Sequence, residues 1–433
     1  MVKDSYAPRN VFVVDGSRTP FLKARGKPGP FLASDLAVSA ARPLLTRQPF
    51  PATAVDEVIV GCIAAGPNEA NIARIIALRL GCGDTVPAWT VQRNCASGLQ
   101  AIDSAALEIA SGRADLVLAG GTESMSHHPI LLNQAMVAWL ADWNRAKSFA
   151  AKSRQLAALR PQHLQLVIAL LRGLTDPLSG LSMGQTAEKL AWRFAIDREA
   201  MDNFAVRSHQ RVAEAIDGGR LDEIEPIYNN SGELFEYDDG LRRDSSIEKL
   251  ATLKPAFDRP VGKVTAGNSA QITDGAAMLL LASEQAVEQH NLPILGRVVD
   301  AQWSALDPTQ MGLGPVHAMG SLLQRQQMDG QEIDYWEINE AFAAQVLACQ
   351  TAWQDADYMQ QEVGLEQPFS TIPEDRLNVD GGAISIGHPV GASGARLVLH
   401  LLKTLKQRGA KRGIASLCIG GGQGGAMLLE VAK

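Results

Sequence analysis

The chain has 433 residues, of which 46% are hydrophobic and 39 are glycines, and its formal net charge is -7. This length exceeds one ordinary core, so we expect a globular α/β protein with at least two core-forming units. The negative charge argues against nucleic acid as a general partner, and no apolar run approaches the length of a membrane span.

The cysteines and the chain ends bear on the cellular compartment. Five cysteines, at positions 62, 82, 95, 349 and 418, form no CxxC motif and no zinc-ligand spacing. Their number and scatter are typical of a reducing compartment, and no metal site is expected. The first ten residues lack the apolar segment of a signal peptide, and the last residues match no retention or peroxisomal signal. We therefore expect a cytoplasmic protein.

Strand-like apolar runs recur along the chain with helical segments between them. The first series comprises residues 11–14, 57–62, 88–91, 116–119 and 277–281. After residues 291–293 a second series follows, at 294–299, 335–338, 377–379, 413–417 and 426–431. Alternating strands and helices predict layered, mostly parallel sheets covered by helices. The repetition indicates two duplicated halves.

Cys95 lies where the predicted strand at residues 88–91 turns into an alanine-rich helix. The free N–H groups and the dipole of a helix start favour a thiolate, and Gly98 would let a ligand approach the backbone. Lowering a thiol pKa from about 8.5 to about 7 needs roughly 2 kcal/mol, whereas a helix terminus supplies about 0.3–1 kcal/mol. A basic partner is therefore needed, and the segment predicts a cysteine-dependent acyl-transfer enzyme.

Between Ser126 and Lys254 the alternation of strands and helices stops. A charged helix is expected over residues 198–217 and a polar hairpin around residues 229–243. From Ser126 to Gly180 the chain carries six basic residues against two acidic ones, interleaved with apolar runs: Arg145, Lys147, Lys152, Arg154, Arg160 and Arg172 against Asp142 and Asp176. This pattern predicts a surface for an anionic membrane or a partner protein. The alternative is a loop domain that covers its own active site and contributes to a dimer.

Three later segments carry further candidate catalytic groups. Asn339 and Glu340 lie where a predicted strand turns into a helix. His388 is the only one of eight histidines in a strand-turn-helix unit like that of Cys95, and the small residues around it leave space for a ligand. Cys418 ends a buried strand and precedes glycines that can expose their N–H groups.

The motifs NCASG, NEAFAAQ, GGAISIGHPVGASG and LCIGGGQGG occur in this order, and in them the chain resembles the thiolase family over almost its whole length. The resemblance implies a five-layered α-β-α-β-α fold from two duplicated halves plus an inserted loop domain, with Cys95 and His388 at facing helix starts. The implied boundaries are residues 1–125 and 256–287 for the N-terminal half, 126–255 for the inserted, coenzyme A-binding loop domain, and 288–433 for the C-terminal half.

The resemblance also implies roles for individual residues. Cys95 is the nucleophile that carries the acyl group, and His388 is its general base. His388 and a water held by Asn339 bind the thioester oxygen, with Glu340 in support. Cys418 moves the proton at the α-carbon of acetyl-CoA, and the N–H groups of Cys95 and Gly420 form a second oxyanion hole. Coenzyme A is a substrate, and no cofactor is bound permanently. Contacts to substrate or coenzyme A are expected from Met183, Arg242, Ser269, Ala270 and Phe342.

The implied activity is that of a 3-ketoacyl-CoA thiolase, which cleaves its substrate with coenzyme A. Alternatives are a short-chain biosynthetic acetoacetyl-CoA thiolase and a catalytically silent acyl-CoA-binding subunit. Ser182 replaces a histidine that many short-chain enzymes have, and Ala270 replaces a serine that commonly contacts pantetheine. Residues 130–180 resemble an insertion in the β-subunits of fatty-acid oxidation complexes, although those commonly have histidine at the position of Asn339. Expected partners are a second copy, as homodimer or homotetramer, and an α-subunit with hydratase and dehydrogenase activities.

Overall fold

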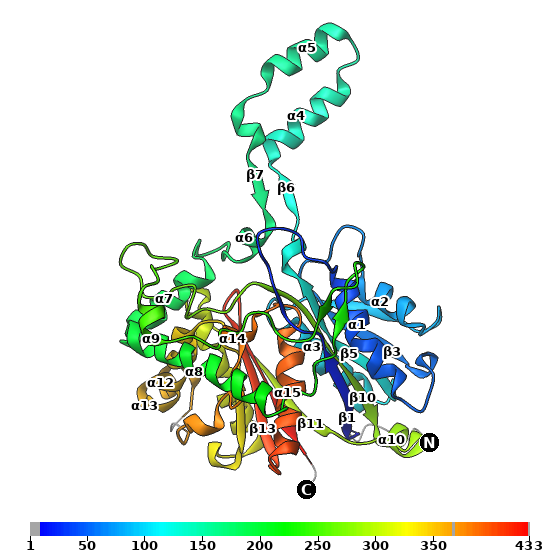
Figure 1. Ribbon diagram of the computed structural model, residues 1–433, viewed down its shortest axis with the longest axis vertical. Coiled ribbons are helices and arrows are strands. Elements are labelled where there is room, and N and C mark those ends of the chain that lie inside the picture. Colours follow the sequence, from blue (N-terminus) through cyan, green and yellow to red (C-terminus); the bar gives the residue numbers. More distant parts are fainter. Residues whose placement is uncertain (1–8, 366–368, 432–433) are drawn as a thin grey trace.

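The computed structural model describes residues 9–365 and 369–431. A ten-stranded mixed sheet runs through the molecule in the order β12-β13-β14-β11-β1-β10-β5-β3-β4, with β2 paired to β10 (Figure 1). The strands are β1 Val11–Arg18, β2 Leu22–Lys23, β3 Glu57–Gly61, β4 Ala88–Val91, β5 Leu116–Ser124, β10 Thr273–Ser283, β11 Gly296–Ala305, β12 Tyr335–Ile338, β13 Arg412–Ile419 and β14 Gln423–Glu430. The short pairing of β1 with β11 joins the strands of the two halves.

Helices on both faces divide the body into layers. In the N-terminal half, α1 (Ala33–Thr46) and α2 (Ile72–Leu80) pack on the outer face of the sheet. In the C-terminal half, α11 (Gly314–Gln326) and α12 (Ala343–Gln354) do the same. Between the halves, α3 (Ser97–Ala110) and α15 (Ser393–Gln407) share one core with the inner faces of both sets of strands. The order helix, sheet, helix, sheet, helix confirms the predicted five-layered fold.

The strand directions differ from the prediction of mostly parallel sheets. Only β3 with β4, β3 with β5, and β12 with β13 run parallel, and the other neighbouring pairs are antiparallel. A connecting helix yields parallel neighbours, whereas β13 and β14 are joined by a tight turn at Gly420–Gly422. The strand predicted at residues 377–379 is also wrong. Leu377 forms a single bridge to Trp336, and Asn378 then turns with a φ of 47°.

The segment after β5 divides into two parts. One part is an arm that stands out from the body: a stalk of β6 (Ile130–Leu132) and β7 (Leu166–Ile168) carries α4 (Gln134–Arg145) and α5 (Phe149–Ala158), and neither helix has a buried residue (Figure 1). The other part, with α7 (Met183–Arg193) and α8 (Arg198–Asp217), packs onto the outer core of the C-terminal half. The charged helix predicted over residues 198–217 is confirmed, and the polar hairpin is reduced to β8 (Ile227–Tyr228) and β9 (Leu234–Phe235).

The remaining helices are short: α6 Ala169–Gly173, α9 Ile247–Ala251, α10 Glu284–His290, α13 Ala356–Tyr358 and α14 Ala383–Ile386. Within residues 9–365 and 369–431, no helix combines the length and the hydropathy needed to cross a membrane. The three domain boundaries stay a prediction, because the inserted segment contributes to the core of the C-terminal half as well as to the arm.

Candidate active site

Cys95 lies in the turn between β4 and α3 and is half-buried. The turn is closed by Ser97, whose Oγ accepts a hydrogen bond from the Arg93 N–H (2.9 Å) and donates one to the Asn94 carbonyl (2.7 Å). Asn94 has a φ of 44°, a left-handed conformation that asparagine tolerates better than most residues. Its side-chain amide donates to the Gly420 carbonyl at 2.8 Å. The nucleophile loop is therefore tied to the turn that follows Cys418.

The thiol of Cys95 is not ionised by its position alone. Burial raises its pKa above 9.0, and although the N–H groups of Gly420 and of Cys95 itself oppose this shift, the charge of Glu123 adds to it. The resting nucleophile is therefore a thiol. This agrees with the expectation that a helix start cannot supply enough free energy and that a base has to take the proton.

The starts of α3 and α15 touch through glycines. A Cβ on Gly98 would lie 2.8 Å from the Gly391 carbonyl oxygen, and a Cβ on Gly394 would lie 2.5 Å from the Leu99 nitrogen. The two helix starts therefore face each other, as the resemblance implied for Cys95 and His388. The interpretation of Gly98 as an opening for a ligand is wrong, because the other helix occupies that space.

His388 follows α14 and Gly387, which has a φ of 102°. Its Nδ1 lies 2.6 Å from the Ser393 Oγ, and that hydroxyl donates to the Pro389 carbonyl at 3.1 Å. The hydroxyl proton is thus engaged, so Nδ1 carries the ring proton and Nε2 is the basic nitrogen. Burial and the charge of Arg396 lower the pKa of His388 to about 3. At neutral pH the resting ring is therefore uncharged, and the lone pair of Nε2 is free of a proton.

Asn339 and Glu340 occupy different environments behind His388. The Asn339 Nδ2 lies 3.5 Å from each ring nitrogen of His388, and its buried Oδ1 has no partner among the described residues. Glu340 instead accepts hydrogen bonds from Ser208 Oγ (2.6 Å), Asn378 Nδ2 (3.1 Å) and the N–H of Ile384 (3.2 Å). Glu340 therefore holds the loop that leads to His388, and Asn339 is the polar group that faces the ring.

Cys418 is buried near the end of β13 and forms a small cluster with the side chains of Met183, Met311, Ala341 and Phe342. Burial raises its pKa well above 9.0, and the neighbouring Cys95 raises it further. The second thiol therefore keeps its proton in the resting state. A Cβ on Gly420 would lie 3.3 Å from the Met183 sulfur, so two of the predicted substrate contacts, Met183 and Phe342, lie beside the predicted catalytic groups.

A cavity of about 310 Å³ approaches this site from the side of the inserted helices. Its lining includes the predicted contacts Arg242, Ser269 and Ala270, together with Lys23, His209, Phe257, Gln271 and Ile384. The Ser269 hydroxyl already donates to the Thr265 carbonyl at 2.7 Å. The backbone carbonyl of Gln271 accepts the backbone N–H of His388 at 3.0 Å, which joins the cavity wall to the loop of His388.

Positive charge gathers at one wall of this cavity. The pKa of Lys23 is lowered by burial and by the charges of Arg242 and Arg25, whereas the charge of Asp239 opposes the shift. The effect of the two arginines indicates that they lie near Lys23. Arg243 turns away and pairs with Asp217 at 2.8 Å. Among the described residues no three His, Cys, Asp or Glu side chains are grouped as metal ligands.

Four further residues of the candidate site were not predicted from the sequence: Asn94, Ser393, Lys23 and His209. The first two lie inside the quoted motifs, so their proximity to Cys95 and His388 was a usable signal. Lys23 and His209 lie in segments with no motif, and only the folded chain brings them to the cavity of Arg242.

Comparisons with known proteins agree with this geometry. Residues 11–285 match the family described as Thiolase, N-terminal domain, and residues 292–431 match Thiolase, C-terminal domain. The mitochondrial trifunctional enzyme subunit beta of Bos taurus is 37% identical over 98% of this chain and 88% of its own length. A 3-ketoacyl-CoA thiolase of Yersinia pestis is 36% identical over 97% of both chains.

Solved structures give the same result. Human mitochondrial 3-ketoacyl-CoA thiolase superimposes with a TM-score of 0.84 at 35% identity, over 98% of this chain and 99% of the other. An acetyl-CoA acetyltransferase from Bacillus anthracis gives a TM-score of 0.83 at 36% identity, over 99% and 100% of the two chains. The resemblance predicted from the motifs is confirmed, and the chain belongs to the thiolase family of acyltransferases.

Proposed function

We propose that this protein is a 3-ketoacyl-CoA thiolase. The observation that carries the proposal is that the starts of α3 and α15, beside Cys95 and His388, face each other, while Cys418 near the end of β13 lies close enough to Cys95 for that thiol to raise its pKa. Relatives named 3-ketoacyl-CoA thiolase and trifunctional enzyme subunit beta, which match almost the whole chain, support it.

The chemistry follows from the protonation states. In the cleaving direction the Cys95 sulfur attacks the 3-keto carbon, and its proton passes to His388 Nε2. The bond between C2 and C3 breaks, the shortened acyl group stays on Cys95, and the acetyl-CoA carbanion takes the proton of Cys418. The thiol of a second coenzyme A then attacks the acyl-enzyme and releases its proton to the solvent, from which Cys418 takes a proton back. Cys95 leaves with the proton of His388, which restores the starting state.

Charge that develops on oxygen in these steps needs hydrogen-bond donors. Asn339, with a water, and the protonated His388 are proposed to stabilise the first oxyanion, and the N–H groups of Cys95 and Gly420 the second. The buried Asn339 Oδ1, which has no partner within residues 9–365 and 369–431, supports the first assignment, because it can accept a hydrogen bond from a water. The hydrogen bond from the Asn94 side chain to the Gly420 carbonyl supports the second assignment, because it holds the Cys95 loop against the turn that contains Gly420.

Coenzyme A is proposed to enter through the 310 Å³ cavity. Its phosphates would meet Lys23 and Arg242, two cations held close together in the free protein. The pantetheine arm would pass Ser269 and Ala270 toward Met183 and Phe342. A solved human mitochondrial 3-ketoacyl-CoA thiolase in complex with CoA, 35% identical to this chain, supports coenzyme A as a substrate.

The direct test measures thiolysis of 3-ketoacyl-CoA substrates of increasing chain length. The wild type is expected to cleave medium or long chains, and Cys95→Ser to lose cleavage without losing its fold. Activity confined to acetoacetyl-CoA would instead favour a short-chain thiolase, which the structural match to acetyl-CoA acetyltransferases also supports. A wild type that binds acyl-CoA but never turns it over would be the silent subunit, and the proposal would fail.

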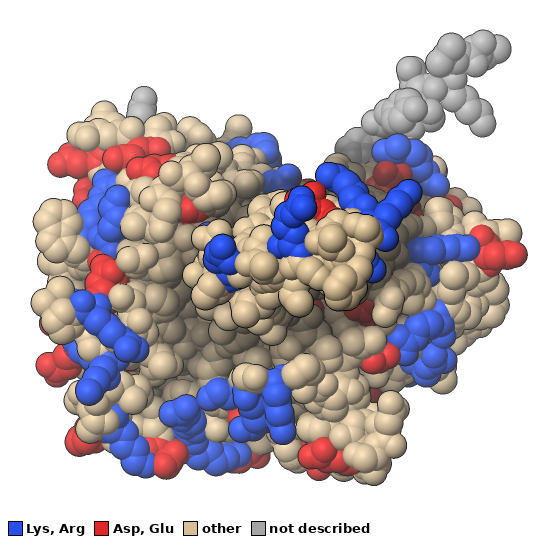
Figure 2. Space-filling view, turned by 90° about the horizontal axis from the view of Figure 1, so that it is seen from above, with Lys and Arg blue, Asp and Glu red and all other residues tan. Residues whose placement is uncertain are grey.

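The arm is proposed to attach the enzyme to a partner. Large apolar side chains are exposed along it, among them Phe149 (89%) and Ile130 (64%), and lysines and arginines gather along one edge, as the view from above shows (Figure 2). A monomer rarely leaves such a surface uncovered. The relative named subunit beta of a trifunctional enzyme supports an α-subunit as the partner, with an anionic membrane as the alternative.

Charge reversal tests this attachment. Lys147→Glu with Arg154→Glu is expected to weaken copurification with the α-subunit in a salt-sensitive way, while thiolysis of free substrate stays unchanged. Arg113→Glu with Lys406→Glu, on the body, serves as the matched control. If the charge reversal instead abolished binding to anionic vesicles, the partner of the arm would be a membrane. Joint loss of turnover and oligomer would show that the arm belongs to the enzyme's own scaffold.

We also propose a homodimer, or a homotetramer of two dimers, in the cytoplasm. β4 is the last strand of the sheet, and its free edge lies directly before the Cys95 turn, with Trp89 38% exposed. Pairing with the β4 of a second copy would cover that edge. All five cysteines are free thiols, which supports a reducing compartment. Light scattering of the purified protein measures the oligomeric state directly.

A further inference from the structure

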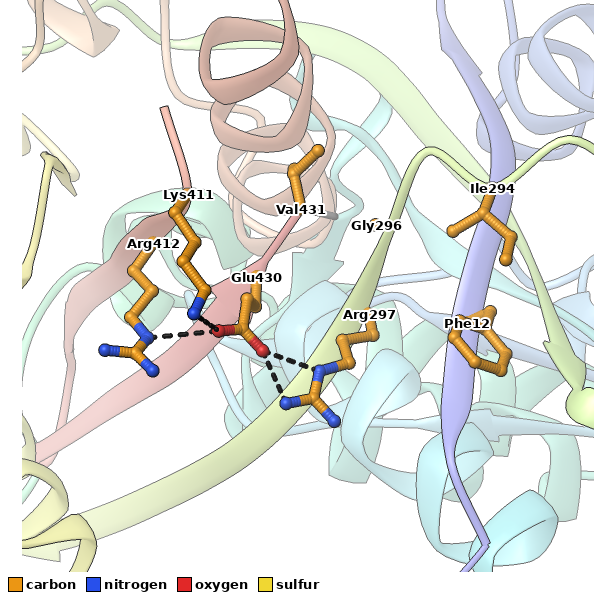
Figure 3. Close-up of a pocket in the computed structure, with 8 residues that line it drawn as sticks. All are labelled: Phe12, Ile294, Gly296, Arg297, Lys411, Arg412, Glu430 and Val431. Atoms are coloured by element: carbon orange, nitrogen blue, oxygen red, sulfur yellow. Dashed lines mark hydrogen bonds and ion pairs between the residues drawn. The ribbon is translucent and has the colours of Figure 1, made fainter. Parts of the chain in front are cut away.

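A second cavity, of about 580 Å³, lies at the seam between the two halves (Figure 3). It is lined by Phe12, Ile294, Gly296, Arg297, Lys411, Arg412, Glu430 and Val431. Arg412 begins β13 and Cys418 lies six residues further along the same strand, so the cavity is about 20 Å from the reacting groups. It is therefore separate from the acyl-CoA site.

The pairing register aligns four of its residues in one row across four strands. Phe12 on β1 pairs with Arg297 on β11, Arg297 pairs with Glu430 on β14, and Glu430 pairs with Arg412 on β13. Residues directly opposite in antiparallel strands project from the same face. The neighbours Val11, Val13 and Leu429 belong to the core around α3 and α15, so the row faces away from those helices.

The carboxylate of Glu430 holds three cations, two in this row and Lys411 beside it. The Glu430 oxygens accept hydrogen bonds from Arg297 Nε (2.8 Å) and Arg412 Nε (3.1 Å) and pair with Lys411 Nζ (3.3 Å) (Figure 3). Salt bridges to these cations, first among them Arg297, lower the pKa of Glu430 against the effect of its burial. The side chain of Glu430 is 11% exposed, whereas those of the cations are 31% to 46% exposed.

The cations keep donors for a ligand. Each guanidinium has five N–H groups and the ammonium has three, whereas one carboxylate offers about four acceptor positions. Arg412 also reaches Glu332 at 3.4 Å, and Arg297 reaches Asn10 at 3.4 Å. Asp334 also lies at this cluster, because its Oδ2 accepts the backbone N–H groups of Lys411 (2.8 Å) and Arg412 (2.9 Å), so three carboxylates balance the three cations. Glu430 therefore holds the cations in place but engages only part of their N–H donors.

Apolar groups form the other side of the cavity. Figure 3 shows Phe12 and Ile294 beyond Arg297, on the side away from Lys411 and Arg412, and Ile294 is 39% exposed. The volume lies within the range of about 300–1,000 Å³ that is usual for small-molecule sites. Planar guanidinium groups suit phosphate oxygens, and an aromatic ring beside them suits a base. We propose that this seam cavity binds a nucleoside phosphate.

The test is calorimetric titration of the wild type with ADP in the absence of coenzyme A, because coenzyme A carries an adenosine diphosphate of its own and would compete for the seam. Saturable binding is expected. Arg297→Gln with Lys411→Gln should weaken it by about tenfold or more, since each lost charged contact is typically worth more than a tenfold change. The matched control, Arg145→Gln with Lys152→Gln on the arm, should bind ADP like the wild type. Thermal unfolding confirms that both variants fold, and thiolysis should be unchanged in both.

A second variant tests the apolar side. Phe12→Leu keeps an apolar core residue but removes the ring, so ADP binding should fall while binding of inorganic phosphate stays the same. The proposal is overturned if ADP does not bind, or if the seam variant and the arm control bind it equally. Equal loss of ADP and phosphate binding in Phe12→Leu would also overturn the assignment to a nucleoside.

Discussion

Gly98→Ala tests whether close contact between two helix starts sets the geometry of catalysis. The added methyl group would lie 2.8 Å from the Gly391 carbonyl oxygen, 3.0 Å from the Ala395 nitrogen and 3.2 Å from the Ala395 Cβ. Two of these atoms belong to the backbone, which cannot rotate away as a side chain can. The start of α15, and His388 before it, must therefore move relative to Cys95.

The magnitude follows from the contact distances. A carbon and a carbonyl oxygen in contact normally lie about 3.3–3.6 Å apart, so the helix starts must separate by about 0.5–0.8 Å. Overpacking of a core costs about 1–3 kcal/mol, and alanine in place of a helical glycine returns about 1 kcal/mol. The free energy of unfolding should thus fall by at most about 2 kcal/mol. A displacement near 1 Å at reacting groups costs up to about 100-fold in rate.

The assay compares kcat for thiolysis with urea unfolding of the same variant. We expect kcat to fall about 10- to 100-fold while the protein remains folded. Gly173→Ala is the matched control, because that glycine is also helical and its added Cβ would meet nothing within 4 Å. If Gly98→Ala kept wild-type kcat and stability, the contact between the helix starts would not position the catalytic groups.

Three further outcomes are expected. In the Cys418→Ala variant, Cys95 should still accept an acetyl group from acetyl-CoA, but the α-hydrogens of acetyl-CoA should no longer exchange with deuterated water. Normal exchange, measured by mass spectrometry, would assign the proton transfer to another group. Ser393→Ala should lower kcat about 10- to 100-fold with little change in KM, because the His388 ring loses the partner that orients it; unchanged kinetics would contradict this. Burial, with the charge of Arg242, lowers the pKa of His209 from 6.5 to about 4. Between these pH values the unfolded chain therefore binds more protons at His209 than the folded chain, and the free energy of unfolding falls as the pH drops from about 6.5 toward 4. In urea titrations across this window His209→Gln should flatten the slope by up to about 1.4 kcal/mol per pH unit, and a slope equal to that of the wild type would refute the assignment.

Local patterns predicted much of the secondary structure. The strand at residues 88–91 and the helix at residues 198–217 coincide with β4 and α8, because apolar periodicity and composition act over a few neighbouring residues. The motifs around Cys95, His388 and Cys418 were sufficient to predict the family, and with it the five-layered fold. The roles of these residues, the domain boundaries, the cytoplasmic location and the oligomeric state stay predictions.

Other features depend on contacts between distant segments. The strands β1, β10, β11 and β14 form antiparallel pairs with strands that are distant in the sequence. Hydrophobic periodicity carries no information on which distant strands pair or in which direction they run. The close approach of Gly98 to Gly391 has the same origin. The sequence does not show whether the space beside a glycine is occupied by a ligand or by another helix.

By itself, then, the sequence determined the family and the layered fold and supplied the candidate reactive groups, since the motifs that carry them are made of residues close together in the chain. The tertiary structure decided their protonation. Burial keeps both Cys95 and Cys418 as thiols and lowers the pKa of His388 to about 3. It also decided which groups share a surface, as in the row that joins Phe12, Arg297, Glu430 and Arg412. Desolvation and strand register are properties of the packed chain, so no local pattern contains them.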